Sequence, residues 1–245
     1  MSNIDVNQIK ISTINIKSAI DYIKNDKGIV KKILIYFGII LLSIIPILNI
    51  FTLCAISGYF VYNSHLRIYD KNKQLSDWKN FEDFIVIGLK YLLAIFAYFF
   101  IFFAVFLFFG LITGITVAIL KTVNILNLGN ISNIVFNMLN LCIDLCITIL
   151  LTAANLQYTK DLKLSSFFNF KEMKNFITQN PVYFLKYLLI LFLLNIVFCV
   201  VSTIIAITIV GLLLLPALLF CYFAIISDIN AQFIRNTYKI GLDLE

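Results

Sequence analysis

The stretch ISNIVFNMLNLCIDLCITILLTAANLQ, residues Ile131–Gln157, decides the fold class of this chain. It is apolar enough to cross a bilayer, yet it carries one polar residue on each successive helical turn. Steps of three and four residues place this series on a single helical face: Asn133, Asn137, Asn140, Asp144, Thr148, Thr152 and Asn155. Such a helix predicts a membrane span whose polar stripe faces other helices or water rather than lipid.

The composition of the whole chain agrees with a membrane protein. Of its 245 residues, 61% are hydrophobic and only 13% are charged, whereas a soluble domain carries about 25% charged residues. Three prolines and nine glycines, with no low-complexity linker, predict a single integral membrane domain over residues 1–245. The net charge of +6 comes from basic residues between apolar runs, so orientation in a membrane explains it without nucleic acid.

Long charge-free runs predict an all-α fold, a polytopic transmembrane helical bundle with about six spans. Between Lys32 and Arg67 a single helix would run roughly 50 Å against a hydrocarbon core of about 30 Å, so two short spans with a turn at Pro46 fit better. The run from Lys186 to Asp228 predicts two spans by the same reasoning, with Gly211 and Pro216 marking the turn. The predicted spans lie near 30–45, 48–66, 85–109, 131–157, 181–208 and 212–232.

The distribution of basic residues fixes the predicted orientation. With one span between Ile85 and Leu120, every Lys and Arg except Lys121 lies on the cytoplasmic side of the plasma membrane, together with both termini. Gly110 and Gly114 then act as breakers, and residues 110–130 form an outer segment that is either re-entrant or a surface helix. Residues 1–27 form a cytoplasmic segment, in which isoleucines at helical spacing from Ile9 to Ile23 predict an amphipathic surface helix.

The sequence Leu-Lys-Tyr-Leu-Leu occurs twice, at Leu89–Leu93 and at Leu185–Leu189. A related approach precedes each copy, Leu75–Trp78 in the first and Leu164–Phe167 in the second. The repeated unit is a span, a basic loop, an amphipathic surface helix and a second span. Both copies cross the membrane in the same direction, which predicts a parallel internal repeat.

The sequence resembles an uncharacterised family of archaeal and bacterial multi-pass membrane proteins, the domain-of-unknown-function family numbered four thousand and thirteen. The resemblance covers most of the chain, and one departure is Ser76, which stands where the family's Leu-Pro-x-Trp motif has proline. The family brings no established activity, so the resemblance supports the topology and says little about mechanism. The matching features are Gly58-Tyr59, Arg67, Leu75–Trp78, Gly88-Leu89, Phe168, Phe170, Gln232 and Arg235.

Asp144 is the first candidate site, because an acid at mid-membrane costs about 2.5 to 3.5 kcal/mol on insertion scales and is a functional candidate by default. In the functional interpretation Asp144 carries a charge or proton, Asn137, Asn140 and Thr148 supply hydrogen bonds, and Asp228 is a candidate partner. In the alternative interpretation the stripe only packs helices together, at about 0.6 kcal/mol for each interhelical hydrogen bond.

Candidates for catalysis or metal binding are few. His65 is the single histidine and stands at a span boundary, and no phosphate-binding loop or hydrolase motif is present. Cys142 and Cys146 flank Asp144, but no histidine stands nearby to complete a metal site. We therefore expect no catalytic, metal or cofactor site.

The sequence is compatible with two functions. The first is a transport or permease-like role, with the polar face of Ile131–Gln157 lining the interior. The alternative is a non-catalytic scaffold that binds a partner or shapes the bilayer through its amphipathic helices. The lipid bilayer is the partner that the sequence implies, while a protein partner or an oligomer is left undecided.

Overall fold

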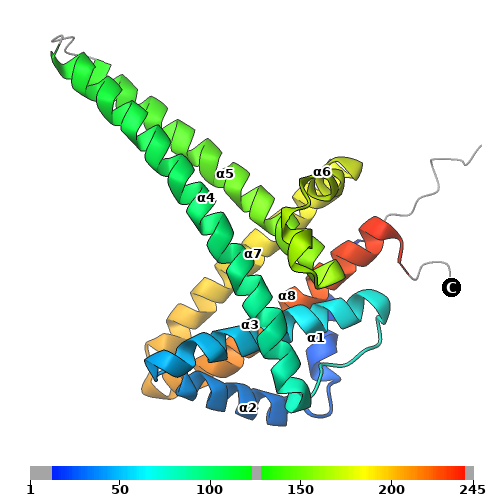
Figure 1. Ribbon diagram of the computed structural model, residues 1–245. Coiled ribbons are helices and arrows are strands. Elements are labelled where there is room, and N and C mark those ends of the chain that lie inside the picture. The colour runs from blue at the N-terminus through cyan, green and yellow to red at the C-terminus, as the bar shows by residue number, and fades with distance from the viewer. Residues whose placement is uncertain (1–12, 123–127, 241–245) are drawn as a thin grey trace, which may run out of the picture.

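A computed structural model describes residues 13–122 and 128–240, and it confirms the predicted all-helical architecture. The described part contains long helices joined by short turns and two short 3-10 helices (Figure 1). In chain order the elements are α1 (Ile16–Lys24), α2 (Ile29–Leu42), α3 (Pro46–Tyr69), η2 (Trp78–Asn80), α4 (Phe81–Thr122), α5 (Leu128–Asp161), η3 (Leu164–Phe168), α6 (Phe170–Gln179), α7 (Pro181–Ala206) and α8 (Ile209–Tyr238).

Among the described residues, five helices are long and apolar enough to cross a membrane: α3, α4, α5, α7 and α8. The first predicted span, 30–45, is instead the 14-residue α2. At roughly 21 Å this helix is shorter than a hydrocarbon core of about 30 Å. The predicted turn at Pro46 is confirmed, since Pro46 is the first residue of α3, where its missing N–H costs nothing.

The turn between the last two spans lies earlier than Gly211 and Pro216 predict. The chain turns at Ile207 and Thr208, and the Thr208 hydroxyl caps α8 by accepting a hydrogen bond of 2.9 Å from the Gly211 N–H. Gly211 is required because a Cβ there would lie 1.7 Å from the Ile205 carbonyl oxygen. Pro216 lies within α8, so the prediction that it marks the turn is wrong.

Gly110 and Gly114 do not break the third span, which corrects the predicted re-entrant or surface segment. Helix α4 runs through both glycines to Thr122, so its 42 residues extend roughly 63 Å. Helix α5 runs back beside it, and the two project together from the rest of the molecule in Figure 1. We call this pair the α4–α5 arm; residues 123–127 at its tip lie outside the described part.

Two glycines explain how α4 packs against α3 near the base of the arm. A Cβ on Gly58 would lie 1.8 Å from the Phe84 carbonyl oxygen, and one on Gly88 would lie 1.8 Å from the Cys54 carbonyl oxygen. The two backbones therefore touch where the helices cross, as small residues permit in membrane helices. This contact gives the Gly58 and Gly88 positions of the family resemblance a physical role.

In both copies of the repeat, the aromatic residue that ends the approach motif stacks on a tyrosine of the preceding span. In the first copy, Trp78 of η2 stacks on Tyr59 of α3 with ring centroids 4.0 Å apart. In the second copy, Phe167 of η3 stacks on Tyr158 of α5 at 4.6 Å. The surface helix of the first copy is reduced to η2, whereas the second copy adds the ten-residue α6.

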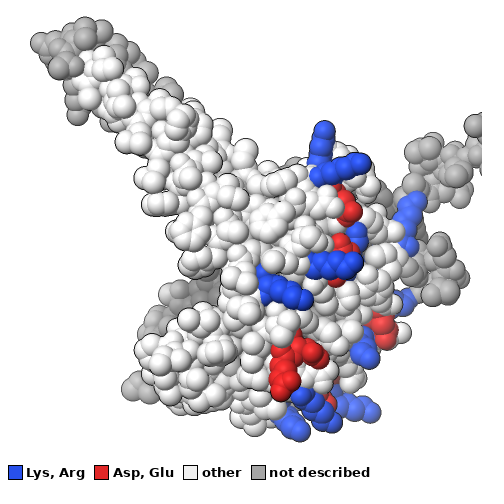
Figure 2. Space-filling view, viewed as in Figure 1, with Lys and Arg blue, Asp and Glu red and all other residues white. Residues whose placement is uncertain are grey.

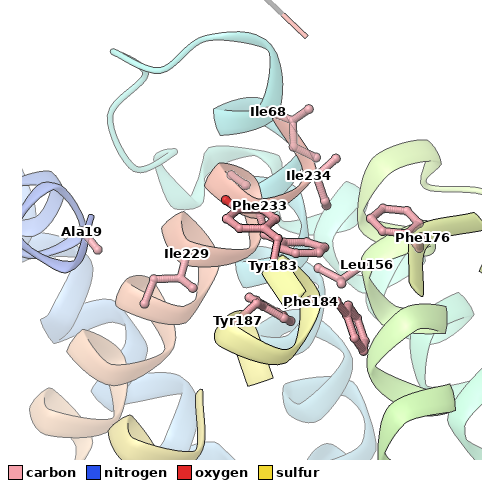
Figure 3. Packing of buried hydrophobic residues seen from close by; sticks show 11 residues of the cluster. Ala19, Ile68, Leu156, Phe176, Tyr183, Phe184, Tyr187, Ile229, Phe233 and Ile234 are labelled. Atoms are coloured by element: carbon pink, nitrogen blue, oxygen red, sulfur yellow. The ribbon is translucent and has the colours of Figure 1, made fainter. Parts of the chain in front are cut away.

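On the face seen in Figure 2, the charged residues gather at one end of the molecule, which we call the charged end, and the rest of the described surface in this view is uncharged. Beneath this end lies a core in which Phe233 of α8 stacks on Tyr187 and Tyr183 of α7 at 4.4 and 5.1 Å (Figure 3). Phe176 of α6 stacks on the same ring at 5.9 Å. Helix α6 is thus anchored to the bundle by its apolar face.

Candidate functional site

The structure leaves the middle of the polar stripe uncovered. Asn137, Asp144 and Thr148 are exposed and Asn140 is partly buried. The opposite face of α5, from Leu139 to Leu150, forms an apolar groove with α4. The stripe therefore points away from α4, and no ion pair or hydrogen bond holds the Asp144 carboxylate within the described residues. The side chain of Asn133 lies outside the described part.

Asp228 lies at the charged end and pairs with Arg67, not with Asp144. Its side chain is fully buried, and one carboxylate oxygen accepts a hydrogen bond from Arg67 Nε at 2.7 Å and lies 2.6 Å from Arg67 Nη2. The other oxygen accepts from the Gln232 amide at 2.7 Å. Charge-assisted bonds of this length are among the strong ones. The ion pair joins α3 to α8.

Helix α1 closes over this ion pair. The Gln232 side chain accepts from the Asn15 N–H at 2.8 Å and donates to the Asn15 carbonyl at 3.1 Å. The Tyr22 ring lies 4.5 Å from the Arg67 guanidinium carbon, a cation–π contact. Burial raises the pKa of the Tyr22 phenol well above its usual range, with Arg67 opposing part of the rise. Within the described part, the Tyr22 hydroxyl is buried without a hydrogen-bond partner.

A second buried ion pair, Asp26 with Lys32, lies at the start of α2 and contacts the loop of the first repeat. Lys32 Nζ lies 2.7 Å from one Asp26 oxygen and 3.0 Å from the other, and it also donates to the Leu75 carbonyl at 2.6 Å. The Trp78 indole N–H donates to the Lys32 carbonyl at 3.3 Å. These contacts tie the loop before η2 to the beginning of α2.

A cavity of about 540 Å³ lies along the face that α3 and α8 share, with walls from α2, α4 and α5. Most of its lining is apolar, including Leu53, Ile56 and Leu219. Several of its polar groups lie near the charged end, namely Ser64, Asn155, Thr159, Ser227 and Asn230, while Ser43, Thr52 and Ser57 line its other part. Ligand sites in proteins are concave and mostly apolar, with a few placed polar groups.

Most of these polar groups already have partners. Ser64 Oγ donates to the Ser227 carbonyl at 2.8 Å, and Ser227 Oγ donates to the Phe60 carbonyl at 2.9 Å, which stitches α3 to α8. Asn230 accepts from the Tyr187 hydroxyl at 2.7 Å. Within the described residues, the Asn155 side-chain amide has no such partner. It is the group in the cavity best placed to bind a ligand.

Asn155 is the last residue of the predicted stripe and the one that lies closest to the charged end. Within the described residues, the stripe therefore lines the cavity only at Asn155. Arg67 and Lys32 were predicted only as charges at span boundaries, and the buried ion pairs that they form with Asp228 and Asp26 were not predicted. The sequence signal for Arg67 and for Lys32 was position alone, since these two residues flank a charge-free run and each stands at a membrane boundary.

The histidine and the cysteines do not assemble into a reactive cluster. His65 Nδ1 lies 3.0 Å from the Thr159 carbonyl, and its ring packs edge-on against Tyr69. The cysteines are free thiols. In the parts of the chain that the structure describes, no three His, Cys, Asp or Glu residues gather as metal ligands would.

Comparison with known proteins gives a family match. The family model described as "Protein of unknown function (DUF4013)" matches residues 39–210, which contain both copies of the repeat. No curated protein and no solved structure matches the chain. The match includes Gly58, Gly88 and Arg67, but it ends before Asp228, the carboxylate that Arg67 binds.

Proposed function

The chain belongs to the DUF4013 family of proteins of unknown function, and we propose that it is a non-catalytic membrane protein with a transport or permease-like role. The observation that carries this proposal is the cavity of about 540 Å³ between α3 and α8. In this proposal the protein lies in the plasma membrane with its charged end on the cytoplasmic side, because basic residues concentrate at that end.

The lining indicates the chemistry of the solute. An apolar body fits the walls at Leu53, Ile56 and Leu219, and a polar head fits beside Asn155 and Thr159. The head should be uncharged, because the nearby Arg67 is already neutralised by Asp228. A charged head would lose its hydration without gaining a counter-charge. A small amphipathic molecule with a hydroxyl or amide head, such as a monoacylglycerol, is the solute class that fits.

Binding to the purified protein in nanodiscs tests this proposal. The probe is a fluorescent monoacylglycerol, followed by anisotropy and compared with the fatty acid of the same chain. Asn155→Leu should weaken binding about three- to tenfold, as expected for one lost hydrogen bond. Ser57→Phe, which adds bulk to the wall, should weaken it further, since the Ser57 hydroxyl bonds only within its own helix.

Asn140→Leu is the matched control, because it makes the same change on the same helix outside the cavity. The wild-type protein should also move the probe across the membrane of proteoliposomes, and Ser57→Phe should stop this movement. Equal binding by wild type, Asn155→Leu and Ser57→Phe would refute a ligand site in this cavity. A preference for the fatty acid would refute the uncharged head.

The scaffold function keeps one specific observation in its favour. Helix α6 buries Met173 and Phe176 against the bundle and leaves Lys171 and Lys174 exposed at the charged end. These lysines are placed to bind anionic lipid or an acidic partner. If charge reversal of both lysines abolishes localisation or assembly while Asn155→Leu has no effect, the scaffold function replaces the transport function.

A further inference from the structure

We propose that two copies of this protein associate through the polar stripe of α5, so that Asn137, Asn140 and Asp144 of one copy meet those of the other within the membrane. The proposal is independent of the cavity and of its ligand. It begins from the uncovered stripe on the α4–α5 arm.

Lipid cannot be the neighbour of this face. Asp144 lies seventeen residues before Asp161, the last residue of α5, so it is about 25 Å from the charged end along the helix. That distance places it inside a hydrocarbon core of about 30 Å. Ionisable residues at such depth face the interior of a bundle or a water-filled cavity. The stripe therefore requires a polar neighbour.

The rest of the described chain does not supply that neighbour. Helix α4 packs on the opposite face of α5, along the groove that Leu139, Cys142 and Cys146 line with Phe102 and Val105. Helices α7 and α8 diverge from the arm in Figure 1. Asn137 and Asp144 remain exposed as a result.

A second copy fits because the stripe is complementary to itself. It holds amide donors at Asn137 and Asn140 and a carboxylate acceptor at Asp144, and Asn140 and Asp144 are one helical turn apart. Across a two-fold axis, the Asn140 amide of each copy can donate to the Asp144 carboxylate of the other, and the two bonds form together. The exposed side chain of Leu141 flanks the stripe and would pack beside these bonds, whereas Met138 and Leu145 point further round the helix.

Cysteine cross-linking in native membranes tests the contact. The native cysteines are first replaced, and single cysteines are introduced as Asn137→Cys and Asn140→Cys, both of which keep Asp144. Met138→Cys and Leu145→Cys are matched controls at the same depth, since they are exposed but turned about 100° from the neighbouring stripe residue. Oxidation should give a yield of covalent dimer at the two stripe positions that is at least about tenfold higher than at the control positions. The controls should react poorly because a turn of about 100° points their side chains away from the other copy.

Equal yields at stripe and control positions would show random collision and would overturn the proposal. So would the absence of dimers at both stripe positions, or cross-links to a different protein.

Energy transfer between labelled copies in liposomes gives a second test. Asp144→Leu should lower the association constant about threefold for each interhelical bond lost, whereas Asp144→Asn keeps the hydrogen bonds and should associate nearly as wild type. Both variants should bind the monoacylglycerol probe as wild type does, which separates this result from failure of the cavity. Undiminished association of Asp144→Leu would overturn the proposal.

Discussion

Breaking the buried ion pair between Arg67 and Asp228 should destabilise the fold more than any exposed charge change. In Asp228→Asn the Arg67 guanidinium keeps its position, but it loses an anion held by two contacts of 2.6 and 2.7 Å. The side chains of Arg67 and Asp228 are only 7% and 0% exposed, so water cannot replace the lost charge. Removing one partner of such a pair costs about 3 to 5 kcal/mol of unfolding free energy.

The matched comparison is the ion pair between Lys160 and Glu172, whose nitrogen and oxygen lie 3.5 Å apart and whose Glu172 side chain is 41% exposed. Glu172→Gln should cost less than about 1 kcal/mol, because solvent screens such pairs. The double variant Arg67→Met with Asp228→Leu should recover most of the loss, since an apolar pair can replace a buried ion pair at little cost.

Unfolding of the purified protein by SDS titration in mixed micelles measures these free energies. Asp228→Asn should unfold at a clearly lower SDS fraction than wild type and Glu172→Gln. The reasoning is refuted if Asp228→Asn lies within about 1 kcal/mol of wild type, the range of an exposed pair. The reasoning is also refuted if the double variant loses as much unfolding free energy as the single variants Arg67→Met and Asp228→Leu lose in sum. Such additivity would show no coupling between the two charges.

The same unfolding assay checks two further changes. Gly58→Ala should destabilise by about 1 to 3 kcal/mol, since the new methyl group would lie 1.8 Å from the Phe84 carbonyl oxygen and force α3 and α4 apart. At Gly110 a Cβ would meet no atom within 4 Å outside its own stretch of helix, so Gly110→Ala should be neutral or stabilising by up to about 1 kcal/mol. Similar losses of stability at both glycines would contradict the close crossing of α3 and α4. Tyr22→Phe should stabilise by about 1 kcal/mol, because it removes a buried hydroxyl without a partner and keeps the ring over Arg67. A loss of stability instead would show that this hydroxyl is bonded.

Most helices could be predicted because their signals are local. Charge-free runs delimit the spans, and Pro46 begins α3 because proline suits the first turn of a helix. Gly110 and Gly114 were misleading for a physical reason. In an apolar environment no water competes for the backbone, so glycine continues a helix that it would weaken in water. The turn before α8 is set by the Thr208 cap, a weaker sequence signal than Gly211 or Pro216.

The site could be predicted only in part, because its contacts join distant residues. Arg67 and Asp228 stand 161 positions apart, and each alone has the appearance of an ordinary charge at a membrane boundary. The polar stripe was visible because it follows the helical period within one segment. Which part of the stripe faces the cavity depends on where α3 and α8 pass. Of the described stripe residues, Asn155 is the one that lines the cavity.

The length of the α4–α5 arm has a consequence for how the protein lies in its bilayer. The apolar stretch Ile85–Leu120 within α4 extends roughly 54 Å, nearly twice the thickness of a hydrocarbon core of about 30 Å. Such a hydrophobic mismatch is relieved by tilting the helix or by local thickening of the lipid. Thicker membranes would hold the arm more upright and thinner ones would incline it further, so lipid composition would set the tilt of the arm relative to the bilayer.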